Sequence, residues 1–480
     1  MQPLEGMDAA FLSLETPTTP LHVGLAMILD PPEGTRSLFS PTTRYAQIRR
    51  VMSQRLHLVP PFRQRAIRVL MGLHHPVWVD DPDFELDDHL FRASLPSPGG
   101  QPELHSVVAS IMSRQLDPDR PLWEMHIVEG LEGDRTALIA KVHHAILDGV
   151  SGASILAAFL DLSPRARAVP LPLEQWDPDP LPSGSELLRY AAGSLTHQPG
   201  RMLSTLQAGV DAVADLGMHN RSLQSRGESP PPSFFSAPRT SFNGAVGSRK
   251  RFCSLAIPLE DAKLVRRVFE CTVNDVILAG VAGGLRQLLE ARGEVLDRAL
   301  VAMVPVSTRP EGEGHALGNQ ISGMLVSLAT DVDDPVRRLD AIAESSRVAK
   351  EQELLHRGRL VGDLAEIATP ALVARLARMV AGSRMFDRVR PPFNVTISGV
   401  KGPDFPLFCA GSRVAATYPL GPIAEGIGLN VTILSYLDHL HFGLYACRNL
   451  LPELAELGQF IDDALGELVG CALDARGATG

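Results

Sequence analysis

The stretch of this 480-residue chain best suited to chemistry is KVHHAILDGVSG, residues 141–152, with adjacent histidines followed by Asp148 and Gly149. An imidazole has an unperturbed pKa of about 6.5, so a histidine fixed at a strand end can accept a proton near neutral pH. Neighbouring strand residues point to opposite faces, so we expect one of His143 and His144 to be reactive and the other structural. Asp148 can orient a turn or an arginine, and Gly149 permits a close approach. The alternative is two core histidines beside an Asp-Gly turn.

The elements that must position these histidines are predicted from hydrophobic periodicity. Residues 124–131 and 136–143 have the pattern of strands, and 154–160 that of a helix. Earlier in the chain we expect a strand over 21–29 and amphipathic helices around 45–56 and 104–111. The first 162 residues therefore form a mixed unit that ends soon after the histidine motif.

A proline-rich stretch separates this unit from a second one. Residues 163–182 hold six prolines, which do not suit helix interiors or central strands. We predict a first domain over 1–162, a partly helical linker over 163–245 and a second domain over 246–480. The second domain is expected to contain the following strands and helices: a strand from 251, helices over 264–268 and 274–289, strands over 299–306, 393–398, 428–434 and 441–446, and a helix from about 453.

Composition narrows the classes of protein. A net charge of −10 argues against a nucleic-acid partner, and 45% hydrophobic with 21% charged residues excludes a disordered chain. The five cysteines show no metal or redox spacing, so we expect reduced core thiols. The N-terminal residues have no secretory pattern, and no window has the length and apolarity of a membrane-spanning helix. We expect a cytoplasmic protein whose membrane contact, if it has any, is peripheral.

On its motifs the chain resembles CoA-dependent acyltransferases, whose HHxxxDG signature matches residues 143–149, and more narrowly the bacterial wax ester synthase/diacylglycerol acyltransferase family. The resemblance covers most of the chain, because the following blocks occur in the family's order: GMDAAFLSLETPTTPLHVG, PPFRQR, WVDDPDFELDDH, RPLWE, VNDVILA, VPVSTR and GNQISGM. It implies a mixed α/β (α+β) fold of two chloramphenicol acetyltransferase-like domains with a tunnel between them.

The resemblance also implies the reaction and its residues. His144 would be the general base, supported by His143, Asp148 and Gly149. A fatty acyl-CoA would donate its acyl group to diacylglycerol, giving triacylglycerol, or to a long-chain alcohol, giving a wax ester. No metal or other cofactor and no covalent acyl-enzyme are implied. Two alternatives stay open: a condensation-type enzyme that uses carrier-protein thioesters, and a catalytically silent lipid-binding relative.

The donor that would stabilise the oxyanion is less defined. The family's Asn-Asp pair matches Asn274 and Asp275, and the Asn274 amide could donate to the thioester oxygen. Asn274 could equally cap the helix that follows it. Thr396 and Ser398 are second-choice donors.

A further tripeptide matches the family's acceptor-side motif. Pro121, Leu122 and Trp123 correspond to the PLW motif that the resemblance associates with the acceptor end of the tunnel. A proline that starts a strand and a tryptophan that packs beneath it would give the same three residues. Both interpretations stay open.

Residues 370–390 form a basic amphipathic segment, with five arginines against Asp387. Such a segment can lie on an inner membrane or lipid-body surface, and a solvated helix face has the same pattern. The chain also departs from the family at Gly399 and Lys401, in a block that usually reads SNVPGP, and at Cys447, where an acid is usual. These departures could alter the tunnel or the domain interface.

Overall fold

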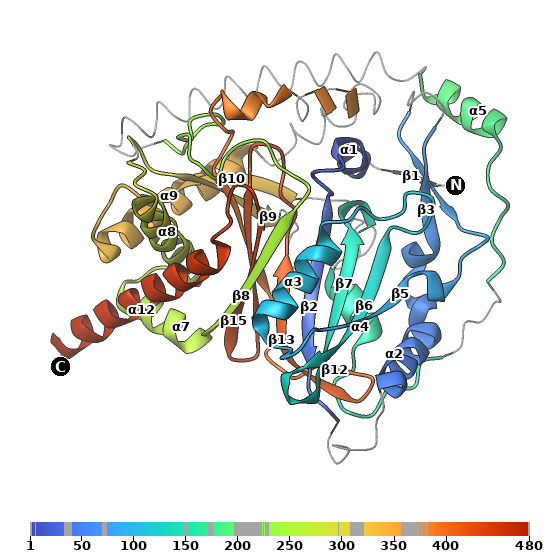
Figure 1. The fold of residues 1–480 in the computed structure, drawn as a ribbon. Helices are drawn as coiled ribbons and strands as arrows, with labels where there is room; N and C mark the ends of the chain where they lie inside the picture. The colour runs from blue at the N-terminus through green and yellow to red at the C-terminus, as the bar shows by residue number, and fades with distance from the viewer. Residues whose placement is uncertain are drawn as a thin grey trace.

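The computed structural model describes most of the chain, as two six-stranded sheets that lie side by side (Figure 1). The described residues are 2–4, 6–32, 41–69, 74–146, 152–170, 176–195, 223, 225, 230–295, 297–307, 321–356, 374–375, 378–379 and 383–478. The predicted mixed α/β class is confirmed.

The first sheet contains the strand that ends in the histidine motif. Its strand order is β12-β13-β2-β7-β6-β5. The bounds are β2 (His22–Leu29), β5 (Leu90–Ser94), β6 (Trp123–Leu131), β7 (Arg135–His143), β12 (Phe408–Cys409) and β13 (Ser412–Leu420). Strands β2 and β7 pair antiparallel, with His22 opposite His143. The strands predicted over 21–29, 124–131 and 136–143 are confirmed to within about one residue at each end.

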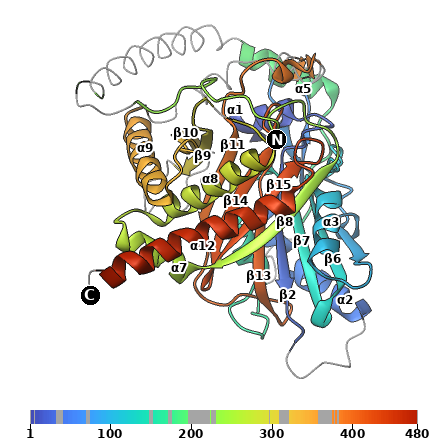
Figure 2. The same ribbon diagram turned by 60° about the vertical axis from the view of Figure 1, so that its left-hand side comes forward.

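The second sheet has the order β10-β9-β11-β14-β15-β8. Its strands are β8 (Lys250–Pro258), β9 (Val301–Ser307), β10 (Ile321–Ser327), β11 (Val395–Lys401), β14 (Leu429–Tyr436) and β15 (His439–Cys447). One face is covered by helices α7 (Leu259–Val268), α8 (Val273–Ala291), α9 (Pro335–His356) and α12 (Leu454–Ala478), as Figure 2 shows. Alternate strand residues such as Val395, Ile397 and Val431 pack against α8 in one large apolar core.

In a one-sided strand exchange, two strands from the second half of the chain join the first sheet. Strands β12 and β13 come late in the chain but complete the first sheet, where Val414 of β13 lies opposite Leu29 of β2. Strand β15 approaches β13 so closely that a Cβ at Gly443 would lie 1.7 Å from the carbonyl oxygen of Pro419. The sequence placed residues 408–420 with the second domain, so the proposed boundary does not anticipate this exchange.

Helix α3 (Gln101–Met112) lies between the sheets. Of the face predicted from spacing, it buries Leu104, Val108 and Ile111, while Val107 is half-buried and Met112 is buried in addition. That face joins a core containing residues from both halves of the chain, including Phe252 of β8. The remaining helices and the small third sheet of the first half are α1 (Gly6–Leu14), α2 (Pro41–Arg55), α4 (Gly152–Phe159), α5 (Gly184–Leu195), β1 (Gln2–Pro3), β3 (Gln64–Ile67) and β4 (Val77–Asp80).

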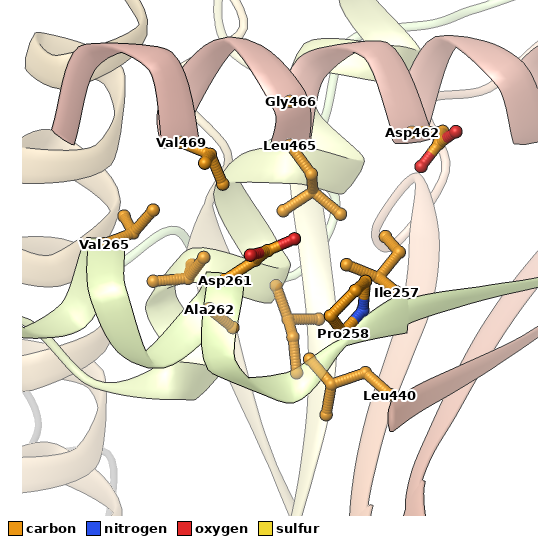
Figure 3. Close-up of a pocket in the computed structure, with 12 residues that line it drawn as sticks. Ile257, Pro258, Asp261, Ala262, Val265, Leu440, Asp462, Leu465, Gly466 and Val469 are labelled. Atoms are coloured by element: carbon orange, nitrogen blue, oxygen red, sulfur yellow. The ribbon is translucent and has the colours of Figure 1, made fainter. Parts of the chain in front are cut away.

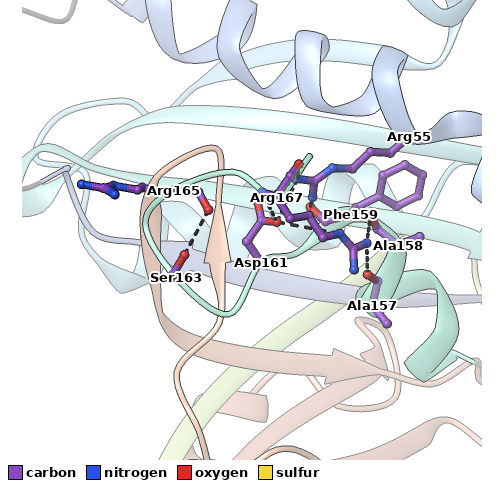
Figure 4. Close-up of polar contacts among 8 residues, drawn as sticks. All are labelled: Arg55, Ala157, Ala158, Phe159, Asp161, Ser163, Arg165 and Arg167. Atoms are coloured by element: carbon purple, nitrogen blue, oxygen red, sulfur yellow. Dashed lines mark hydrogen bonds and ion pairs between the residues drawn. The ribbon is translucent and has the colours of Figure 1, made fainter. Parts of the chain in front are cut away.

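A buried ion pair fixes the helix that follows the histidine motif (Figure 4). Arg55 of α2 donates to both carboxylate oxygens of Asp161, at 2.8 and 3.0 Å, and to the carbonyl oxygen of Phe159 at the end of α4. Both charged side chains are only 2% exposed. The backbone of Asp161 also exchanges two hydrogen bonds with Phe408 of β12. Arg55 and Asp161 therefore tie α2, the end of α4 and β12 together.

Five cysteines are free thiols, as predicted: three are buried and two half-buried. Burial raises the pKa of the Cys253 thiol to about 11, so this group is not a ready nucleophile. Among the described helices none is long and apolar enough by itself to cross a membrane. Only α7 and α8 taken together reach that length and composition, and they are bent by 103° at their junction.

Candidate active site

The end of β7 is held by backbone hydrogen bonds on both sides. The His143 N–H donates to the carbonyl oxygen of Leu122 at 2.9 Å, and the His144 N–H donates to that of Leu21 at 3.0 Å. The chain then turns into a short 3₁₀ helix, His144–Ile146. Because neighbouring strands fix both backbones, the two imidazoles have defined and different directions, as the alternation of a strand predicts.

The His143 side chain is almost wholly buried, at 1% exposure. Its Nδ1 accepts a hydrogen bond from the Ala145 N–H at 3.1 Å, so in the neutral ring the proton is on Nε2. Burial, more than any neighbouring charge, lowers the pKa of His143 to about 3. This imidazole is therefore neutral and accepts a hydrogen bond from the turn that follows it, and its supporting role in catalysis stays a prediction.

His144 is half-buried and lies against α1. Its ring stacks on Phe11, with 4.1 Å between ring centroids and 26° between the planes. Its Nδ1 is buried and has no hydrogen-bond partner among the residues that the structure describes. Burial lowers the pKa of His144 to about 4, so the ring is neutral at pH 7. A neutral, oriented imidazole with an unused ring nitrogen is the form that a general base requires.

A carboxylate that the sequence did not single out lies beside His143. Glu15, directly after α1, has Oε2 3.8 Å from Nε2 of His143 and Oε1 3.3 Å from Nε2 of His22. Neither contact is aligned as a hydrogen bond. Burial lowers the pKa of His22, and the positive charge of Lys141 lowers it further. This cluster could be predicted only by knowing how β2 pairs with β7, because that pairing places His22 opposite His143.

Lys141 continues the polar cluster along β7. Its side chain is fully buried, and its ammonium donates to the carbonyl oxygen of Arg114 at 2.7 Å and to Glu124 at 3.4 Å. Burial lowers the pKa of Lys141 although Glu124 opposes the shift. Lys141 and His143 share one face of β7, opposite to that of His144. The polar cluster therefore belongs to the face that supports the motif.

Two predicted members of the motif lie outside the described residues. Asp148 and Gly149 fall within residues 147–151, between the 3₁₀ turn and α4. Their predicted roles, orienting a turn and permitting a close approach, stay predictions.

Asn274 lies at the N-terminal end of α8 but does not cap it. Thr272 is the N-cap: its Oγ1 accepts from the Asp275 N–H at 3.1 Å, and its own N–H donates to Asp275 at 2.9 Å. The interpretation of Asn274 as the cap is wrong, because the reciprocal hydrogen bonds of Thr272 and Asp275 already cap the N-terminal end of α8. The amide oxygen of Asn274 would lie 3.3 Å from a Cβ at Gly399. The Asn274 side chain therefore lies next to Gly399 of β11, one of the positions where the sequence departs from the family.

Within the described part of the chain, the Asn274 side chain forms no hydrogen bond. Its assignment as an oxyanion donor stays a prediction. The second-choice donors, Thr396 and Ser398, alternate along β11 with Val395 and Ile397, which pack toward α8. Thr396 and Ser398 therefore lie on the opposite face of β11 from Asn274. They and Asn274 cannot donate to the same oxyanion.

Pro121, Leu122 and Trp123 form a buried support beside β7. Trp123 is 1% exposed, stacks between Phe62 and His89, and donates from Nε1 to the carbonyl oxygen of Phe62 at 2.8 Å. Leu122 supplies the carbonyl that fixes the His143 backbone. Packing accounts for these contacts, and the acceptor-side role of the tripeptide stays a prediction.

A cavity of about 120 Å³ lies elsewhere, between α7 and α12 (Figure 3). Most of its lining side chains are apolar, and the lining also includes Asp261 and Asp462. All of its lining residues come from the second half of the chain, and none belongs to the histidine motif. We therefore do not place the reaction there. Within the described part of the chain, no group of histidine, cysteine and carboxylate side chains could hold a metal.

Comparisons with known proteins agree with the motifs. Residues 4–277 match the model of the wax ester synthase/diacylglycerol acyltransferase catalytic domain, and residues 317–469 match that of the WS/DGAT C-terminal domain. A Mycobacterium tuberculosis protein named a putative diacylglycerol O-acyltransferase is 33% identical over 99% of this chain and 91% of its own length. A second one is 35% identical over 93% and 92%.

Solved structures share the fold. The wax ester synthase/diacylglycerol acyltransferase from Marinobacter aquaeolei VT8 is 29% identical with a TM-score of 0.67, covering 98% of this chain and 100% of its own. The TRI3 trichothecene 15-O-acetyltransferase from Fusarium sporotrichioides has a TM-score of 0.57 at 9% identity, covering 98% and 94%. At that identity the likeness concerns the fold alone.

Proposed function

Because the chain belongs to the wax ester synthase/diacylglycerol acyltransferase family of acyltransferases, we propose that it transfers a long-chain acyl group from acyl-CoA to diacylglycerol, forming triacylglycerol. Long-chain alcohols are proposed as second acceptors, giving wax esters. The names of the mycobacterial relatives favour diacylglycerol as the main acceptor. The observation that carries the proposal is the neutral imidazole of His144, stacked on Phe11 at the strand end.

In the proposed reaction, His144 removes the proton of the acceptor hydroxyl while that oxygen attacks the thioester carbonyl carbon. The new carbon–oxygen bond gives a tetrahedral oxyanion, and its collapse breaks the carbon–sulfur bond. The CoA thiolate leaves and takes up the proton held by the imidazolium. Base catalysis of this type contributes about 10²- to 10⁴-fold. No cofactor enters this scheme, since acyl-CoA is itself the activated substrate.

The environment of His144 supports this assignment. A pKa of about 4 keeps the ring unprotonated over the whole physiological range. The low value also weakens the base, so the acceptor hydroxyl must be desolvated with it for the transfer to be favourable. Contact with the Phe11 ring supplies an apolar wall of that kind. For the oxyanion, we propose the unused amide of Asn274, and one well-placed donor is typically worth about 3 kcal/mol.

One competition assay tests the proposed function. Purified protein receives radiolabelled palmitoyl-CoA with diacylglycerol and hexadecanol together, and the labelled lipids are separated. We expect labelled triacylglycerol as the main product and wax ester as the minor one. A dominant wax ester would overturn the acceptor preference. Transfer only from a carrier-protein thioester would favour the condensation-type alternative, and binding of lipid with no turnover would favour the silent relative.

A further inference from the structure

Two neighbouring phenylalanines lie at the tip of an exposed turn. The turn spans 233–236 and is closed by the Ser236 N–H, which donates to the carbonyl oxygen of Ser233 at 3.1 Å. Phe234 and Phe235 occupy its centre and are 57% and 58% exposed. Large aromatic side chains are usually mostly buried, so two adjacent exposed rings need an explanation.

The backbone of this turn is strained in a way that keeps the rings outside. Phe235 has φ of +65°, a left-handed conformation that glycine adopts readily and bulky residues adopt rarely. Its N–H donates to the carbonyl oxygen of Pro392 at 3.1 Å, which fixes this conformation. Glycine would fit this position at lower energy, yet the chain carries an aromatic ring there. Strain of this kind concentrates at functional surfaces.

The segment that holds the turn adds apolar and basic side chains. Residues 384–390 dock on the same region, because the Asp387 carboxylate accepts from the Ala245 N–H at 2.8 Å and its carbonyl oxygen accepts from Arg239. Met385 and Val389 of this segment are exposed. The turn and this segment, about 150 residues apart in the sequence, therefore form one surface.

Exposed arginines surround the apolar side chains of this surface. Arg239, Arg384, Arg388 and Arg390 all belong to it. Arg384 is paired with Asp387, whose pKa is lowered by the Ala245 N–H and by Arg384. Arg388 and Arg390 form no ion pair within 4 Å with a described residue. The four arginines outnumber the carboxylate of Asp387 within this surface and that of Asp297, whose pKa Arg390 helps to lower, whereas the whole chain has a net charge of −10.

This surface lies on the edge of the molecule that carries α1. In Figure 1 the segment around residues 383–390, in orange, lies along the upper edge of the view, and α1 lies toward the same edge. The contacts agree: the Phe386 ring would meet a Cβ at Gly426, and the adjacent Glu425 accepts a hydrogen bond from Thr18, in the turn between α1 and β2. These contacts connect the 384–390 segment to the turn that follows α1.

We propose that this surface docks on an anionic phospholipid surface. The interfacial patch comprises Phe234, Phe235, Met385, Val389, Arg239, Arg384, Arg388 and Arg390. The rings enter the boundary between headgroups and acyl chains, and the arginines contact headgroup phosphates. The reason for this docking rests on the proposed function, since diacylglycerol and triacylglycerol reside in such lipid surfaces. Binding to the surface can be tested without any turnover.

The test is cosedimentation of the full chain with phosphatidylcholine vesicles, with and without phosphatidylglycerol. We expect binding that requires the anionic lipid and falls with salt. The double variant F234S/F235S is expected to lose about tenfold or more in partitioning, and R384Q/R388Q/R390Q about a hundredfold, at about fivefold per arginine. The matched controls are L162S, an exposed leucine elsewhere, and R92Q/R135Q/R267Q, three exposed arginines elsewhere, and both should bind as the unmodified chain does.

A third variant separates binding from folding. F235G relieves the left-handed strain, so its melting temperature should hold or rise while vesicle binding falls. Equal binding by F234S/F235S and the unmodified chain would overturn the proposal. The proposal would also be overturned if the unmodified chain formed a dimer that these variants dissociate while vesicle binding stays unchanged. The patch would then dock a second copy of the chain. Turnover of a water-soluble short-chain acyl-CoA and alcohol should be unchanged in the variants, which separates this proposal from the proposed function.

Discussion

Two His-His pairs in this chain have the same dipeptide and different surroundings. His74 and His75 lie in a loop before a proline, where Nδ1 of His74 is 3.3 Å from the His75 carbonyl oxygen and its ring meets Tyr190 edge-on. His143 and His144 end a central strand and are fixed by backbone bonds to strands on both sides. The dipeptide alone therefore carries little information. Its position at the end of a central strand is what buries one ring and directs the other toward α1.

The largest expected effect is a loss of acyl-transfer activity that distinguishes the His143–His144 pair from the His74–His75 pair. His144→Gln should lower kcat/KM for acyl transfer by about 10²- to 10⁴-fold, because a glutamine cannot take the acceptor proton. His74→Gln is the matched control and should leave kcat/KM unchanged. Both variants should melt at the temperature of the unmodified chain within a few degrees. Comparable turnover by the His144 and His74 variants would show that the motif histidine is not the base.

The next effect tests how the region after the motif is held. Arg55→Leu removes the closest charged partner of the buried Asp161 carboxylate, which keeps only the Arg167 N–H and the Arg167 guanidinium at 3.9 Å. Breaking a buried pair of this kind costs up to about 3–5 kcal/mol of unfolding free energy. Adding Asp161→Leu should recover part of the loss, because no charge then stays buried. Arg49→Leu breaks an exposed pair with Asp87 and is the control that should change little. Denaturant titration measures all three, and equal losses for Arg55→Leu and Arg49→Leu would contradict the clamp.

The pH dependence of the unfolding free energy tests whether the two motif histidines are buried. The folded pKa values of His143 and His144 are about 3 and about 4, below the ordinary 6.5. Stability is therefore full above pH 6.5 and falls as pH drops, because the unfolded chain binds protons that the folded chain does not. The slope is about 1.4 kcal/mol per pH unit for each buried histidine. His143→Asn, which keeps an acceptor for the Ala145 N–H, should flatten the slope by about one histidine, and an unaltered slope would contradict the assigned burial.

The smallest effect concerns the carboxylate between His143 and His22. Glu15→Gln keeps the shape of the side chain and removes its charge, so we expect about a fivefold loss of kcat/KM, the size of one polar contact. The pH–rate profile should shift as well, which a purely structural role would not produce. A loss as large as that of His144→Gln would instead place Glu15 in the proton transfer itself.

Local patterns predicted the elements around the motif. The strand ending at His143 and the helix over 104–111 follow from periods of about 2 and 3.6 residues, which depend on neighbours close in sequence. The interpretation of Trp123 as a packed residue also needed only local information. The family resemblance then supplied the role of His144, which no periodicity contains.

Long-range pairing accounts for what the sequence did not predict. The exchange of β13 into the first sheet pairs residues that are hundreds of positions apart in the sequence. The Glu15–His22–His143 cluster depends on strand register for the same reason. The cap of α8 was missed by two positions, because TVND offers two possible caps and only the structure selects Thr272.

Titration of the His144 imidazole by NMR tests the central claim most directly. Its Cε1 proton is assigned by its absence in His144→Gln, and its shift is followed as pH falls. A desolvated ring stacked on Phe11 should stay neutral until the pH approaches about 4. A midpoint near the ordinary value of about 6.5 would mean a solvated histidine and would contradict its role as a buried general base.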